Sequence, residues 1–169
     1  MGNVREFDIT LLPLLLTISS DFADMYPNAE VIGTDLSPIQ PSWVPPNCFF
    51  EIEDATQAWT FKENDFDLVH MRYLVGSIPD WTELFKQAYR VLKPGGWLES
   101  FESDAPITSK DGTVKDESAL HQWGIMFGEA GRRTGRSFLV IDEDLQRKAM
   151  EEAGFVNIMQ FDFDVSGFL

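Results

Sequence analysis

The stretch FDLVHMRYLVGSIPDWTELFKQAYRVLKPGGWLE, residues 66–99, decides the fold. It begins with a nearly continuous apolar run, which is typical of a β-strand covered on both faces. A helix follows, in which Asp80 and Glu83 resemble a capping box and the apolar residues recur at helical spacing. The residues KPGG (93–96) predict the end of this helix, and GWLESFE (96–102) predicts another strand. This order predicts two parallel strands joined by a crossover helix.

The rest of the chain continues the alternation of strand and helix patterns. Besides those above, we predict strands at 14–18, 29–35, 48–54 and 155–163, and helices at about 19–25, 116–133 and 142–154. Asp142 is the expected cap of the last helix, and Leu120 and Trp123 belong to the expected apolar face of the helix before it. The sequence therefore predicts an α/β fold, with a mostly parallel sheet and helices on both faces.

Composition narrows the classes of partner. The chain carries 28 acidic against 13 basic residues, a net charge of −15, which disfavours nucleic acid and anionic membrane surfaces as partners. The apolar run at 9–18 is too short to cross a bilayer, and the single cysteine, Cys48, can form no internal disulfide. We expect a soluble protein of the cytoplasm or nucleus, with Cys48 packed in the interior and no metal site.

Four motifs follow one another in a familiar order: AEVIGTDLSP, FEIEDATQAWTF, the stretch at 66–99 and EEAGFVNI. Their order and spacing resemble a class I S-adenosylmethionine-dependent methyltransferase, and more narrowly the fungal LaeA-like methyltransferase-domain proteins. The resemblance implies a Rossmann-like fold and methyl transfer from S-adenosylmethionine to a small molecule or protein. It also implies a single domain, 1–169, which consists of an atypical segment at 1–21, a family-like core at 22–158 and a truncated end at 159–169.

The resemblance also implies which residues contact the adenosine. Asp35 ends the second predicted strand, 29–35, and is expected to accept the ribose hydroxyls, with Leu36 and Ser37 beside it. Asp54 is expected to receive the adenine amino group, with Glu53 as the competing carboxylate, and the backbone N–H of Ala55 is expected to face the ring. Both acids can alternatively be solvated strand ends.

Three residues near the end of the 66–74 strand lie where members of the family contact the methionine part of the cofactor. His70 is either a base near neutral pH or a buried core histidine. Met71 is expected beside the cofactor, and Arg72 either pairs with its carboxylate or forms an ion pair with Asp67 or Asp80. We assign no catalytic residue, because the sulfonium is already activated and alignment contributes most to methyl transfer.

The sequence departs from the family at both ends. The family's glycine-rich loop should follow the first strand, but no glycine occurs between Asn3 and Gly33. We therefore expect Thr17, Ile18 and Ser19 where the backbone should approach the cofactor, and weakened binding. The acid that should end the first strand also looks absent, unless Asp21 replaces it.

The family's C-terminal hairpin looks incomplete, which predicts an open sheet edge that a protein partner or a second copy could cover. Two alternatives to an active methyltransferase follow: a catalytically inactive interaction module, or a truncated gene product. An NAD-dependent oxidoreductase ranks last, because it needs the same glycine loop.

Overall fold

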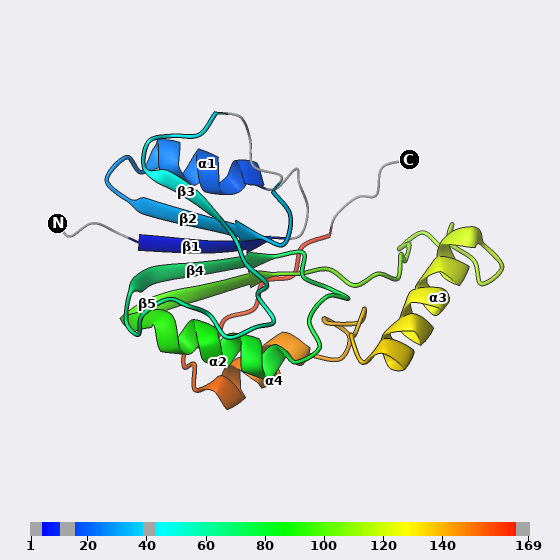
Figure 1. Cartoon of the computed structure of the whole chain (residues 1–169). Helices are drawn as coiled ribbons and strands as arrows, with labels where there is room; N and C mark the ends of the chain where they lie inside the picture. Colours follow the sequence, from blue (N-terminus) through cyan, green and yellow to red (C-terminus); the bar gives the residue numbers. More distant parts are fainter. Residues whose placement is uncertain (1–4, 11–15, 39–42, 165–169) are drawn as a thin grey trace.

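The computed structural model describes residues 5–10, 16–38 and 43–164, and Figure 1 shows their arrangement. The strands are β1 (Arg5–Thr10), β2 (Glu30–Asp35), β3 (Cys48–Ile52), β4 (Phe66–Arg72) and β5 (Leu92–Phe101). The helices are α1 (Leu16–Met25), α2 (Trp81–Val91), α3 (Ala119–Thr134) and α4 (Leu145–Ala153). The five strands pair in parallel in the order β3-β2-β1-β4-β5, which confirms the predicted parallel sheet.

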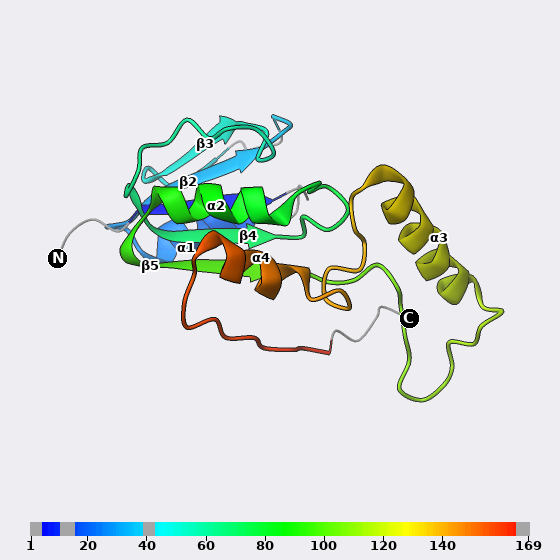
Figure 2. The ribbon, with the colours of Figure 1, turned by 90° about the horizontal axis from the view of Figure 1, so that it is seen from below.

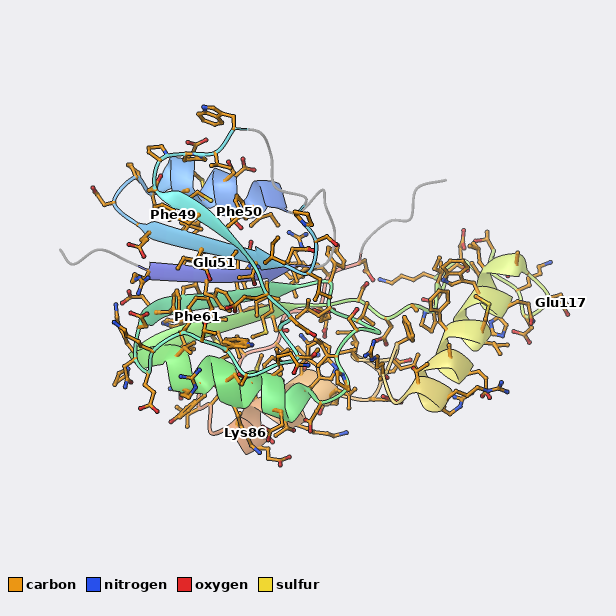
Figure 3. All side chains as sticks on the ribbon, in the orientation of Figure 1. Phe49, Phe50, Glu51, Phe61, Lys86 and Glu117 are labelled. Atoms are coloured by element: carbon orange, nitrogen blue, oxygen red, sulfur yellow. The ribbon has the colours of Figure 1, made fainter. Side chains whose placement is uncertain are left out.

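Helices cover both faces of the sheet, as predicted. In Figure 2, α2 and α4 lie in front of the sheet and α1 lies behind it. The face under α2 holds the main core, where Phe7 and Val69 pack in one buried cluster with Phe85 of α2. Figure 3 labels Phe61, whose ring meets that of Phe7 at a centroid distance of 4.6 Å. We call the opposite side of the sheet the α1 face.

The predicted first strand at 14–18 is wrong, since the strand lies earlier, at Arg5–Thr10. Residues 16–18 belong to α1, so Thr17, Ile18 and Ser19 are helical and do not form the predicted loop, while residues 11–15 lie outside the described residues. The reason is that a leucine-rich run suits a helix at least as well as a strand. The alternation in REFDIT instead places Phe7 and Ile9 on one face of the sheet and Glu6 and Asp8 on the other.

The elements around α2 follow the prediction closely. Asp80 caps the helix by accepting a hydrogen bond from the N–H of Glu83 at 3.0 Å. Strand β5 then begins at Leu92, earlier than predicted, and its register shifts near its start. Gly95 has a φ of 84°, a backbone conformation that is unfavourable for residues with a side chain. Lys93 is anchored there by an ion pair of 2.6 Å with Asp67.

The later elements differ more from the prediction. Helix α3 is capped by Ser118, and its fully buried residues are three glycines. Of the predicted apolar face, Leu120 and Trp123 are exposed, while Phe127 and Ala130 are half-buried. Helix α4 follows Asp144, so Asp142 is not its cap.

The predicted strand at 155–163 is also wrong, because those residues form no strand and four of their apolar side chains are exposed. Within the described part of the chain no strand pairs with the outer edge of β5. The described helices include none that is long and apolar enough to cross a membrane.

Candidate functional site

The order of the strands reverses between β1 and β4, and a crevice outside the carboxyl ends of the strands at such a point is where open α/β sheets bind ligands. Asp35 ends β2 at this edge, and its side chain is buried. Its Oδ1 accepts a hydrogen bond from the N–H of Ser37 at 2.8 Å. Its Oδ2 is also buried and has no hydrogen-bond partner among the described residues. A ribose hydroxyl would satisfy this acceptor, so the site fits the predicted role.

The other residues expected near the adenosine are more exposed. Leu36 and Ser37 are exposed beside Asp35. The Oδ1 of Asp54 accepts bonds from the N–H and the hydroxyl of Thr56, and these bonds lower the pKa of the carboxyl. Asp54 is therefore a charged acceptor just beyond β3, while Ala55 packs partly against the core. Oε1 of the competing carboxylate, Glu53, accepts a hydrogen bond from the hydroxyl of Thr60.

Asp8 supplies an acid in the first strand that sequence reasoning missed. It lies on β1 in register with His70 on β4, and it is almost fully buried. Its Oδ2 accepts a bond of 2.6 Å from the hydroxyl of Ser19 on α1, and its Oδ1 lies 3.0 Å from Nδ1 of His70. The strand predicted at 14–18 contains no acid, whereas the observed first strand carries Asp8, two residues before its end at Thr10. The signal was the alternation of charged and apolar residues in REFDIT.

His70 is buried beside Asp8, and two effects act on its pKa. Burial lowers the pKa, but the hydrogen bond and the charge of Asp8, together with the charges of Glu99 and Glu6, outweigh burial, so the net change is upward. A histidine with a raised pKa keeps its proton to higher pH and is a weaker general base near neutrality. The geometry favours the structural reading of His70. The neighbouring Met71 points to the opposite face and is fully buried in the core, so only its backbone can reach a cofactor.

Arg72 ends β4, and its guanidinium stacks on two aromatic rings. Its Cζ lies 4.7 Å from the ring centre of Phe101 and 5.1 Å from that of Tyr73. Neither predicted ion pair forms, because Asp67 pairs with Lys93 and Asp80 caps α2. Its Nε is buried and has no hydrogen-bond partner among the described residues. The structure thus holds a stacked cation, without a described carboxylate partner, at the edge where a ligand would bind.

Glu102 fixes the loop that follows β4. It is buried just beyond β5, and its two oxygens accept the N–H groups of Leu74 and Val75, each at 2.9 Å. Burial raises the pKa of Glu102 to about 7, although the two hydrogen bonds oppose the increase. Glu102 therefore positions the backbone next to Arg72. Among the described residues no cluster of His, Cys, Asp or Glu could hold a metal ion.

A parallel sheet of this order, with an acid at the end of β2, defines a Rossmann-like fold, a class whose members bind nucleotide-type ligands outside the carboxyl ends of the strands. The model of the family described as "Methyltransferase domain" matches residues 19–160, and the chain belongs to this family.

Among the curated relatives, the secondary metabolism regulator LAE1 of Cochliobolus heterostrophus is 39% identical over 142 residues, which are 83% of this chain and 46% of the relative. The methyltransferase pytC of Aspergillus terreus is 38% identical over 143 residues, 84% of this chain and 43% of the relative. The chain thus spans less than half the length of these two relatives.

A solved structure supports the fold. Phosphoethanolamine N-methyltransferase 2 of Haemonchus contortus, in complex with phosphomonomethylethanolamine and S-adenosylhomocysteine, has a TM-score of 0.62 at 20% identity. The match covers 92% of this chain and 34% of that protein. At this identity the likeness shows the shared fold, and the residues that hold a ligand must be argued from this chain itself.

Proposed function

We propose that the chain binds S-adenosylmethionine at the carboxyl ends of β1, β2 and β4, and transfers its methyl group to a small molecule or a protein. The observation that carries this proposal is the buried carboxylate of Asp35, which has one oxygen held by Ser37 and one without a described partner. The membership of the methyltransferase-domain family supports the choice of cofactor.

Each part of the cofactor has a candidate residue. Asp35 accepts the ribose hydroxyls, Asp54 and the N–H of Ala55 receive the adenine, and Arg72 pairs with the carboxylate of the methionine part. The stacking of Arg72 on Tyr73 and Phe101 keeps its guanidinium in place, so less side-chain entropy is lost on binding. Bound S-adenosylmethionine supplies a methyl group already activated for transfer. The chain contributes alignment, and no residue is assigned as a base.

The first experiment tests the site of the ribose. Calorimetric titration with S-adenosylhomocysteine should show binding to the natural chain, and Asp35→Asn should weaken it about 10- to 100-fold, because a charge-assisted hydrogen bond contributes about 1.5–3 kcal/mol. Glu51→Gln is the matched control, because Glu51 is exposed on β3 and should leave the affinity unchanged. Absence of binding to the natural chain at millimolar ligand would overturn the proposal.

The second experiment separates the two ends of the cofactor. 5′-Methylthioadenosine has the adenosine part of S-adenosylhomocysteine but lacks its amino and carboxylate groups. Arg72→Gln should weaken S-adenosylhomocysteine about tenfold or more and leave 5′-methylthioadenosine unchanged, since only the former carries a charge for Arg72. Equal losses for both ligands would show that Arg72 supports the fold and does not bind the carboxylate.

A second candidate function is a non-enzymatic interaction module. It is favoured by the outer edge of β5, which no described strand covers, and by the exposed side chains of Met159, Phe161 and Phe163 in the segment after α4. Exposed edges and apolar side chains of this kind suit pairing with another chain. Light scattering across a concentration series tests this function, and a monomer that binds S-adenosylhomocysteine at micromolar affinity would contradict it.

A further inference from the structure

The turn after β4 holds a tyrosine in a backbone conformation that L-residues rarely adopt. Tyr73 has a φ of 53°, in the left-handed region, and directly follows Arg72 at the end of the strand. This conformation is unfavourable for a residue with a side chain, and it persists only where the surroundings impose it. The turn lies at the carboxyl edge of the sheet, and strained residues cluster at sites that bind ligands.

The left-handed turn places the ring of Tyr73 beside Arg72. Side chains alternate between the two faces of a strand, so an extended Tyr73 would project to the face opposite that of Arg72. Instead, the ring centre of Tyr73 lies 5.1 Å from Cζ of Arg72 and 5.7 Å from the ring centre of Phe101. Phe101 is in register with Arg72 on β5 and projects from the same face. The turn therefore completes a pair of rings against which the guanidinium rests.

Three consecutive N–H groups tie this turn to the end of β5. The N–H of Tyr73 donates to the carbonyl oxygen of Phe101 at 3.1 Å. The N–H groups of Leu74 and Val75 donate to the two oxygens of Glu102, each at 2.9 Å. Figure 1 shows the ends of β4 and β5 side by side. Because Glu102 directly follows Phe101, its carboxylate fixes the turn relative to the strand that carries the second ring.

Holding the turn with Glu102 places an acid in the interior, which is unfavourable for its charged form. Glu102 is 9% exposed, and burial raises its pKa to about 7, although the two N–H groups oppose the increase. The ionised carboxylate has two acceptor oxygens and no donor, so it can satisfy both N–H groups, whereas an amide has only one acceptor. The fold thus maintains a costly group here, and its two bonds restrict both the position and the direction of the turn.

Arg72 gains a fixed position from this arrangement. Its Nε is buried without a hydrogen-bond partner among the described residues, and its guanidinium rests against the two rings. A guanidinium stacked on aromatic rings can still donate paired hydrogen bonds from its edge to a carboxylate. Paired bonds need planar alignment, so a shift of either ring would misdirect this edge.

We infer that Glu102 is a positioning residue for ligand recognition: it holds the turn at Tyr73 against β5 and so directs the guanidinium of Arg72 toward the carboxylate of the cofactor. This role rests on the proposed function, in which Arg72 receives that carboxylate. Glu102 does not touch the ligand and acts through Tyr73 and Arg72. Its loss should therefore weaken only ligands that carry a carboxylate.

Two ligands measured by calorimetry separate positioning from other effects. The deamino analogue of S-adenosylhomocysteine keeps the carboxylate and lacks the amino group, while 5′-methylthioadenosine lacks both. Glu102→Gln should weaken the deamino analogue about fivefold and leave 5′-methylthioadenosine unchanged. Removal of a negative charge alone would strengthen the binding of an anion, so the sign separates positioning from charge. Glu99→Gln is the matched control, because Glu99 is an exposed acid on the same strand, and it should weaken neither ligand.

Variants of Tyr73 test the same role with Glu102 in place. Tyr73→Phe keeps the ring and should bind the deamino analogue like the natural chain. Tyr73→Leu has the same unfavourable backbone but no ring, so it should weaken the deamino analogue about threefold and leave 5′-methylthioadenosine unchanged. In Arg72→Gln, the further change Glu102→Gln should weaken the deamino analogue no more, because both residues act through one guanidinium.

The outcomes distinguish this role from the proposed function. If the natural chain binds neither ligand, the proposed function fails and the role of Glu102 fails with it. If Arg72→Gln weakens the deamino analogue but Glu102→Gln weakens neither ligand, or both equally, the proposed function stands and the role of Glu102 is wrong. If Glu102→Gln does not fold, the comparison of Tyr73→Leu with Tyr73→Phe decides, and equal binding by these two variants overturns the role.

Discussion

Glu6 gives the sharpest prediction of stability. Its side chain is 2% exposed on the α1 face of β1, and its Oε2 has no hydrogen-bond partner among the described residues. Burial raises the pKa of Glu6 from 4.5 to about 8, and the nearby charge of Asp8 contributes in the same direction. The folded state therefore binds a proton that the unfolded chain releases at neutral pH.

The sign of the effect follows from this difference in proton binding. A raised pKa in the folded state means that the proton stabilises the fold below about pH 4.5, and that this stabilisation is lost as the pH rises toward about 8. At 1.36 kcal/mol per pH unit, the loss between pH 5.5 and pH 8 is about 3 kcal/mol. Glutamine has the shape of the protonated acid and does not ionise. Between pH 5.5 and pH 8, the free energy of unfolding should therefore fall by about 3 kcal/mol less in Glu6→Gln than in the natural chain. Relative to the natural chain, the variant should be more stable at pH 8 than at pH 5.5.

Urea unfolding at pH 5.5 and pH 8, followed by circular dichroism, measures the effect. Glu102→Gln is the matched control, because Glu102 is also buried with a raised pKa, but both its oxygens accept backbone hydrogen bonds. An amide can satisfy only one of the two N–H groups, so this variant should be less stable by about 1–3 kcal/mol. The reasoning is refuted if Glu6→Gln changes stability equally at the two pH values or lowers it like Glu102→Gln.

Three further predictions concern packing and capping. Gly33→Ala should destabilise the chain by about 1–3 kcal/mol in urea unfolding, because the added Cβ would lie 2.5 Å from the ring of Phe50; no loss would show that this ring moves aside easily. Cys48 should react with iodoacetamide at pH 8 far more slowly than free cysteine, because burial raises the pKa of its thiol to about 11; labelling at the rate of free cysteine would contradict its burial. Asp80→Ala should lower the thermal midpoint by the equivalent of about 1 kcal/mol, since the N–H of Glu83 loses its acceptor, whereas Asp80→Asn should restore most of the loss.

Much of the centre of the chain was predictable because its signals are local. The apolar run at β4, the cap at Asp80 and the positive φ at Gly95 each depend on residues within a few positions, and the structure confirms the parallel sheet that the local patterns predict. The ends were harder. The leucine-rich run before Ile18 suits a strand or a helix by composition, and only pairing with β2 and β4 selects REFDIT as the first strand.

The candidate site divides in the same way. The position of Asp35 at the end of β2 follows from sequence, but its unpartnered oxygen does not. From the sequence, Arg72 was expected either to form an ion pair with Asp67 or Asp80 or to bind the carboxylate of the cofactor. In the structure Asp67 pairs with Lys93 and Asp80 caps α2, so neither acid pairs with Arg72. Pairings of this kind depend on which loops meet at the carboxyl edge of the sheet, which short-range patterns do not encode.

The sequence by itself determined the class of fold and the family, since strand and helix patterns, caps and motif order are written in short segments. The tertiary structure alone decided that Asp8 meets His70, whose positions are 62 residues apart in the chain. It also decided that Glu6 is buried without a described partner for Oε2. Burial raises the pKa of Glu6 and the contact with Asp8 raises that of His70, and these surroundings exist only once the strands and helices have packed together.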